Sequence, residues 1–141
     1  MFEKFFLVNI KEKGINLKSI ENLDVYKRTH KLTLNLYKIT KHFPQQEKYG
    51  LTNQIRRAAA SINSNLMEGA HRNSIKEYIQ FAAIARGSSG ELKYQLLLAK
   101  DLNYINEKKY YKFNKEINDI SKMIAGLIRS LKKKTNTNTK N

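Results

Sequence analysis

The sequence predicts an all-α protein, an antiparallel up-down-up-down four-helix bundle with an N-terminal extension. Helix breakers are scarce, because the 141 residues include one proline and six glycines. Apolar residues recur at steps of three and four through four successive segments, which is the period of a helix with one buried face. The connections between these segments are short and therefore favour antiparallel neighbours. We expect the bundle to occupy residues 24–134, as one domain with a core of its own.

Residues 1–23 are predicted to be an extension of the bundle, either an added short helix or a loose segment. Glu3 and Lys4 interrupt its apolar start and no small-residue cleavage site follows, so it does not resemble a signal peptide. No apolar run reaches the roughly 18 residues that cross a membrane. The chain also lacks cysteine, which fits a reducing compartment. A cytoplasmic protein without membrane contact is expected.

The first helix is predicted to begin with Asp24 as its N-cap and to end before Pro44. Its apolar face is Val25, Leu32, Leu36, Ile39 and Phe43.

The second helix is expected to follow a cap at Thr52 and to run to about Arg72. Its apolar face contains Leu51, Ile55, Ile62 and Leu66. An equally regular polar line occupies another face, formed by Gln54, Arg57, Ser61, Asn65 and Glu68. Two ordered faces indicate a helix that is contacted on both sides.

The third helix, residues 74–103, has Ser74 as its predicted N-cap and Glu77 as the partner in a capping box. The run 87–90 (GSSG) in its middle is unusual, because glycine costs about 1 kcal/mol in a helix interior. A kink would explain the glycines, and so would close approach of a neighbouring helix. Close approach is the preferred explanation, because residues 58–61 (AAAS) form a matching small patch on the second helix.

The fourth helix is predicted to start after a cap at Asn106 and to carry a heptad seam, consisting of Phe113, Ile117, Ile120, Ile124, Leu127 and Leu131. Residues 135–141 are expected to be a disordered tail. More apolar residues are present than one seam needs, among them Leu97, Leu98 and Tyr104. The surplus predicts contact with another subunit.

The charge is strongly basic, with 27 Lys and Arg against 12 Asp and Glu, for a net charge of +15. Residues 24–43 carry a net +4 and residues 107–134 a net +6, so the excess lies on the first and last helices. Such a surface is typical of proteins that bind nucleic acid, although lysines that only solvate helix faces would give the same count. The expected nucleic-acid contacts are Lys27, Arg28, Lys31, Lys38, Lys108, Lys109, Lys112, Lys115, Lys122 and Arg129, with the lysines that follow.

Catalytic and metal chemistry find little support in the sequence. His30, His42 and His71 share no metal-ligand spacing, so no metal and no cofactor is predicted. Glu68 and Glu91 could pair with Arg57 or Arg86, and a buried or half-buried ion pair that fixes helix register is a better explanation of these acids than catalysis. An RNA-processing enzyme would need paired acid-base groups, which are not found.

A series of ordered motifs runs through about residues 24–131. They are FP at 43–44, YGLTNQIRRAA at 49–59, SINSN at 61–65, EG at 68–69, EY at 77–78, ARGS at 85–88, EL at 91–92, QLLLA at 95–99, L at 102 and YI at 104–105. These motifs closely resemble those of a known family, the four-helix-bundle proteins encoded in intervening sequences of bacterial large-subunit ribosomal RNA genes. This family includes the accessory variability protein of diversity-generating retroelements. Two departures are Asn63, where the family usually has proline, and Gly90, where a larger residue is common.

The resemblance implies a bundle that assembles as a ring, commonly a pentamer, and it supplies no established catalytic residue. For the retroelement member it implies binding to a reverse transcriptase and to nucleic acid through a basic surface. The motif residues with an expected structural role are Arg57, Ser61, Asn65, Glu68, Gly69, Arg86, Gly87, Ser88 and Glu91.

Two functional hypotheses follow. The preferred one is a non-enzymatic homo-oligomer that binds RNA or DNA through basic helix faces without sequence specificity. The alternative is a structural or protein-interaction module, such as a reverse-transcriptase accessory protein, whose charge serves solubility.

Overall fold

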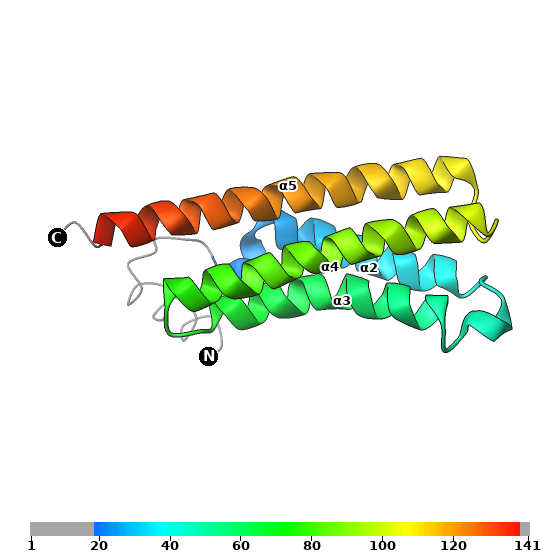
Figure 1. Cartoon of the computed structure of the whole chain (residues 1–141), viewed down its shortest axis with the longest axis horizontal. Coiled ribbons are helices and arrows are strands. Elements are labelled where there is room, and N and C mark those ends of the chain that lie inside the picture. The colour runs from blue at the N-terminus through cyan, green and yellow to red at the C-terminus, as the bar shows by residue number, and fades with distance from the viewer. Residues whose placement is uncertain (1–18, 139–141) are drawn as a thin grey trace.

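A computed structural model describes residues 19–138, and this part of the chain is a bundle of four α-helices (Figure 1). The helices are α2 (Asp24–Thr40), α3 (Leu51–Ala70), α4 (Ile75–Asp101) and α5 (Glu107–Asn138). Two 3-10 turns, η1 (Ile20–Asn22) and η2 (Gln45–Glu47), precede α2 and α3. The predicted all-α fold is confirmed. None of the helices within residues 19–138 is long and apolar enough to cross a membrane.

The helices differ in length, and this difference shapes the molecule. The α3–α4 pair makes the most extensive contact, α5 packs on α4, and α2 contacts both α3 and α5. The 17 residues of α2 span about 26 Å, whereas the 32 residues of α5 span about 48 Å. Only the N-terminal half of α5 therefore has α2 beside it (Figure 1).

The core follows the predicted apolar faces. Its fully buried side chains include Ile55, Ile62 and Leu66 of α3 and Leu92 and Leu96 of α4. The predicted seam of α5 contributes four buried residues, Ile117, Ile120, Ile124 and Leu131. The other two seam residues, Phe113 and Leu127, are partly buried against this core.

Two of the four predicted helix caps are confirmed. The Ser74 hydroxyl accepts a hydrogen bond from the Glu77 backbone N–H (3.1 Å), and the Asn106 side chain accepts one from the Lys109 N–H (2.8 Å). Asp24 is not a cap, because it is the first helical residue and Leu23 precedes it. Thr52 is also not a cap, because α3 starts at Leu51 and the Thr52 side chain is buried.

Close approach of α3 and α4 occurs at Gly69. A Cβ atom built on Gly69 would lie 2.7 Å from the Cβ of Phe81 and 3.3 Å from the carbonyl oxygen of Tyr78. The prediction of close contact at Gly87 is wrong, because nothing in the described chain lies within 4 Å of a Cβ placed there or on Gly90. Both glycines face away from the core, while Ser89 between them is buried.

Asn63, where the resembling family usually has proline, lies inside an unbroken α3. Its side-chain Nδ2 donates a hydrogen bond of 2.9 Å to the carbonyl oxygen of Tyr26. The asparagine thus connects α3 to α2, which proline could not do because its ring carries no side-chain donor.

Both ends of the predicted bundle need correction. Residues 1–18 of the predicted extension lie outside the described residues, but Ile20 is buried in the core, so the bundle starts before residue 24. At the other end α5 continues to Asn138, four residues into the predicted disordered tail, and residues 139–141 lie outside the described range. Threonine hydroxyls donate to carbonyl oxygens four residues back, from Thr135 to Leu131 (3.1 Å) and from Thr137 to Lys133 (2.8 Å). These bonds satisfy the hydroxyls within the helix.

Candidate nucleic-acid interface

Two stripes of mostly polar and basic side chains, one on α2 and one on α5, face each other. On α2 and the residues after it, Lys31, Asn35, Lys38 and His42 recur at steps of four, three and four and are all exposed. On α5 the facing residues are Lys109, Lys112, Phe113 and Glu116. The C-terminal end of α2 lies beside the N-terminal end of α5, because the two helices run antiparallel.

A groove runs between the two stripes. Its larger part is a hollow of about 360 Å³, lined by Asn35, Lys38, Ile39, His42, Lys109, Lys112 and Phe113. Its smaller part, of about 170 Å³, is lined by Arg28, Lys31, Leu32, Asn35, Lys112, Phe113 and Glu116. The two hollows share Asn35, Lys112 and Phe113 and are therefore adjacent. We call them together the α2–α5 groove.

The charge along the groove is uneven. The larger hollow has three exposed lysines and a histidine in its lining and no carboxylate among its seven lining residues. At the other end Arg28 binds Glu116 through two hydrogen bonds (2.8 and 2.9 Å) and Asp119 through a third (3.0 Å). The hydrogen bond to Glu116, and to a smaller extent the one to Asp119, raises the pKa of Arg28 above its usual value, so the guanidinium stays charged. Positive potential is consequently concentrated at the Lys38–Lys112 end.

The groove has an apolar floor beneath the lysines. Ile39 and Phe113 are partly buried and pack against the core, so their positions are fixed by the bundle. A site with cations on the rim and an aromatic ring below can bind the phosphates and the bases of nucleic acid together.

The structure brings five of the ten predicted contacts into the groove lining, namely Arg28, Lys31, Lys38, Lys109 and Lys112. The other five, Lys27, Lys108, Lys115, Lys122 and Arg129, are exposed outside that lining. Arg28 differs from the other four, because its guanidinium already binds two carboxylates. Sequence reasoning missed Asn35, Ile39, His42 and Phe113 as a site. The regular spacing of Lys31, Asn35, Lys38 and His42 could have indicated this face of the helix. A count of Lys, Arg, Asp and Glu leaves out Asn35 and His42.

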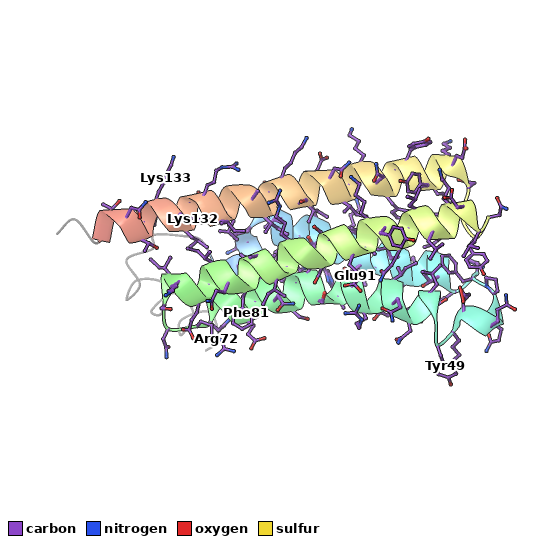
Figure 2. All side chains as sticks on the ribbon, viewed as in Figure 1. Tyr49, Arg72, Phe81, Glu91, Lys132 and Lys133 are labelled. Carbon is purple, nitrogen blue, oxygen red and sulfur yellow. The ribbon has the colours of Figure 1, made fainter. Side chains whose placement is uncertain are left out.

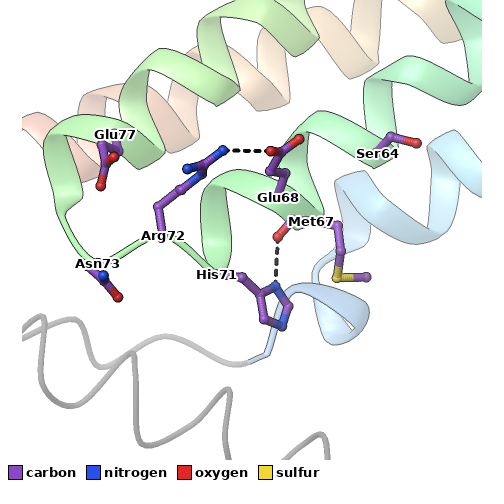
Figure 3. Close-up of a pocket in the computed structure, with 7 residues that line it drawn as sticks. All are labelled: Ser64, Met67, Glu68, His71, Arg72, Asn73 and Glu77. Carbon is purple, nitrogen blue, oxygen red and sulfur yellow. Dashed lines mark hydrogen bonds and ion pairs between the residues drawn. The ribbon is translucent and has the colours of Figure 1, made fainter.

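A third hollow, of about 670 Å³, lies outside the groove at the C-terminal end of α3, lined by Ser64, Met67, Glu68, His71, Arg72, Asn73 and Glu77 (Figure 3). Arg72 and Glu68 form an ion pair across it (2.7 Å), and Arg72 also lies 4.7 Å from the centre of the Phe81 ring (Figure 2). His71 Nδ1 is 2.7 Å from the carbonyl oxygen of Met67. Glu68 therefore pairs with Arg72 and not with Arg57 or Arg86, which were the expected partners.

Most of the remaining motif residues make polar contacts within a helix or between helices. Arg57 and Glu91 form the predicted ion pair between α3 and α4, but on the surface, with side chains 52% and 41% exposed. Arg86 donates to the Ser121 hydroxyl of α5 (3.3 Å).

Within α3, Ser61 and Asn65 donate to backbone carbonyl oxygens of Ala58 (2.9 Å) and Ser61 (2.8 Å). On α4, Ser88 is half-buried beside the exposed Gly87. No group of three His, Asp or Glu side chains within residues 19–138 could hold a metal ion.

Comparison with known proteins agrees with the helical fold. A family model described as 23S rRNA-intervening sequence protein matches residues 21–126. Among solved structures, a protein of unknown function from the S23 ribosomal protein family of Bacteroides thetaiotaomicron is similar, with a TM-score of 0.69 and 24% sequence identity. The match covers 74% of this chain and 97% of that one, and shows that the two share a fold. No curated protein matches.

Proposed function

Because the chain belongs to the 23S rRNA-intervening sequence protein family, we propose that it is a non-enzymatic, homo-oligomeric protein that binds RNA or DNA through the α2–α5 groove. We place this activity in the cytoplasm. The binding is mainly electrostatic and tolerant of sequence, because the groove offers lysines to phosphates.

The observation that carries the proposal is the group of lysines at one end of the groove. Lys38, Lys109 and Lys112 line one hollow whose lining includes no carboxylate. Each lysine that neutralises a phosphate releases a condensed counterion, which favours binding. Lys108 and Lys115 are exposed on the same helix and extend the positive surface beyond the hollow.

Homo-oligomer formation is supported by the exposed face of α4. Gly87 and Gly90 lie on this face in the middle of a helix, where each costs about 1 kcal/mol relative to alanine. Contacts within the described subunit do not explain them. Ile84 and Tyr94 flank them and are 52% and 64% exposed. Packing of a second subunit against this face would bury the apolar side chains and use the space above the glycines.

A ring of subunits, commonly a pentamer in the resembling family, would repeat the groove once per subunit. Several weak phosphate contacts on one strand would then add through multivalency. A catalytic role is not part of the proposal, because the two acids considered for catalysis, Glu68 and Glu91, each bind an arginine.

The test is a binding titration with two matched double variants. Fluorescence anisotropy of a labelled mixed-sequence RNA is measured at about 50 mM salt. Replacing Lys38 and Lys112 together with glutamine should weaken binding roughly tenfold, because two phosphate contacts are lost. The control replaces Lys48 and Lys76, which are exposed outside the groove, and removes the same charge.

The control variant should bind within about twofold of the wild-type protein. If the wild-type protein fails to bind RNA and DNA, or if both double variants lose equal affinity, the groove is not the site. The structural or protein-interaction module would then explain the charge better.

A further inference from the structure

The proposed function leaves open which form of nucleic acid the groove takes. We infer that the α2–α5 groove seats a single strand, with phosphates on its rim lysines and one base against Phe113. This inference rests on the proposed function and deepens it.

The size of the groove is the first argument. At about 360 Å³ the larger hollow is near the lower limit of small-molecule sites, roughly 300 Å³, so it has room for one nucleotide but not for a stretch of duplex. A duplex keeps its bases stacked inside and presents phosphates on a convex surface. It could contact the rim lysines, but it could not place a base on the floor.

The arrangement of cations is the second argument. Lys109 and Lys112 are about 4.5 Å apart along the α5 axis, and Lys38 stands on the opposite wall. Lys31 lies seven residues before Lys38, about 10.5 Å along α2. The lysines therefore flank the floor on both sides and continue along it, so a strand can be held by its backbone with a base directed inward.

The floor is the third argument. Phe113 and Ile39 form an apolar surface between charged side chains, and an aromatic ring can stack on any of the bases. Because Phe113 also packs on the core, its ring is held in place before a strand binds. Exposed Asn35 offers both a donor and an acceptor beside this ring.

The paired acids limit the length of the site. Glu116 and Asp119 lie at the Arg28 end, where they neutralise the guanidinium and would repel further phosphates. The bound strand is thus confined to a few nucleotides around Lys38, Lys109 and Lys112 in each subunit.

The experiment compares single-stranded and duplex RNA of equal length by anisotropy, with single-stranded DNA as a third probe. Phe113→Leu keeps an apolar side chain on the core but removes the aromatic face. It should weaken binding of both single strands about fivefold or more and change duplex binding less than about twofold. Tyr111→Leu, an exposed aromatic residue of α5 outside the groove lining, is the matched control and should leave single-strand binding unchanged.

Two results would overturn the inference, provided that the wild-type protein still binds RNA. In one, Phe113→Leu weakens single-strand and duplex binding equally; in the other, it weakens neither. In either result the proposed function stands and only the single-strand assignment fails. Absence of any wild-type binding would instead remove the proposed function itself. Displacement of RNA by polyglutamate as effectively as by unlabelled RNA of equal charge would assign the groove to an acidic peptide.

A second variant keeps the test decisive if Phe113→Leu does not fold. Asn35→Asp introduces a carboxylate at an exposed position of the groove and should weaken single-strand binding several-fold more than duplex binding. Gln80→Glu, exposed on α4, makes the same change in charge and should affect neither. Equal losses on both probes with Asn35→Asp would again reject the single-strand site.

Discussion

Gly69 is the residue that sets the distance between α3 and α4. The two helices pack closely here, because its missing side chain leaves room for Phe81 and for the backbone of Tyr78. Burial of the Tyr78 ring at this contact raises the pKa of its hydroxyl above the usual tyrosine value.

Gly69→Ala should destabilise the protein by about 1–3 kcal/mol, because the added methyl group overlaps Phe81 and the helices must separate. Urea unfolding measures this loss. Ser64→Ala is the control on the exposed face of α3, and it should change stability by less than about 0.5 kcal/mol. Equal stability of Gly69→Ala and the wild-type protein would show that the α3–α4 contact is looser than described.

Features that depend on neighbouring residues, such as the helix caps, could be predicted from the sequence. Contacts between helices could not. The caps at Ser74 and Asn106 depend on residues within one turn, so their spacing is sufficient. Gly69 and Gly87 both lie in helical segments. Only the position of the neighbouring helix distinguishes the glycine that is needed for packing from the one on the surface.

Between elements, Arg28 is the principal polar connection of α2 to α5. Its guanidinium reaches Glu116, 88 residues later in the chain, and Asp119. The sequence shows a charge at position 28 but cannot indicate a partner this far along the chain. For this reason the sequence alone predicts a nucleic-acid contact for Arg28. The helices themselves could be predicted, because the three-four spacing of apolar residues is a local property.

Arg28→Gln should lower stability by about 1 kcal/mol, since a bidentate ion pair that is partly exposed is lost and two carboxylates are left close together. Thermal unfolding detects the change. Lys27→Gln, at the exposed neighbouring position, serves as the control. A double-mutant cycle with Glu116→Gln that returns no coupling energy would contradict the described pair.

For the whole molecule, the exposed face of α4 predicts assembly. Light scattering at micromolar concentration should give a multiple of the 16.5 kDa subunit mass for the wild-type protein. Ile84→Glu should shift the mass toward one subunit, because it places a charge in the proposed apolar contact. Lys76→Glu, exposed elsewhere on α4, should leave the mass unchanged. A wild-type protein that is monomeric would reject the assembly.

The bundle and its family could be predicted from the sequence, whereas the groove could not. Motif order and apolar spacing are sufficient for the fold. The groove depends on the register of α2 against α5, which places His42 near Lys109 and Asn35 near Phe113. That register results from packing across about 70 intervening residues, and the spacing within either helix does not contain it.

The most direct test of the central claim is the salt dependence of RNA binding. The logarithm of the association constant should fall linearly with the logarithm of salt concentration, by roughly 0.7–0.9 for each phosphate contact. Replacing Lys38 and Lys112 with glutamine should reduce this slope by about 1.5, while the Lys48 and Lys76 control keeps the wild-type slope. Binding that does not depend on salt, or a slope that the Lys38 and Lys112 replacements leave unchanged, would contradict phosphate recognition in the α2–α5 groove.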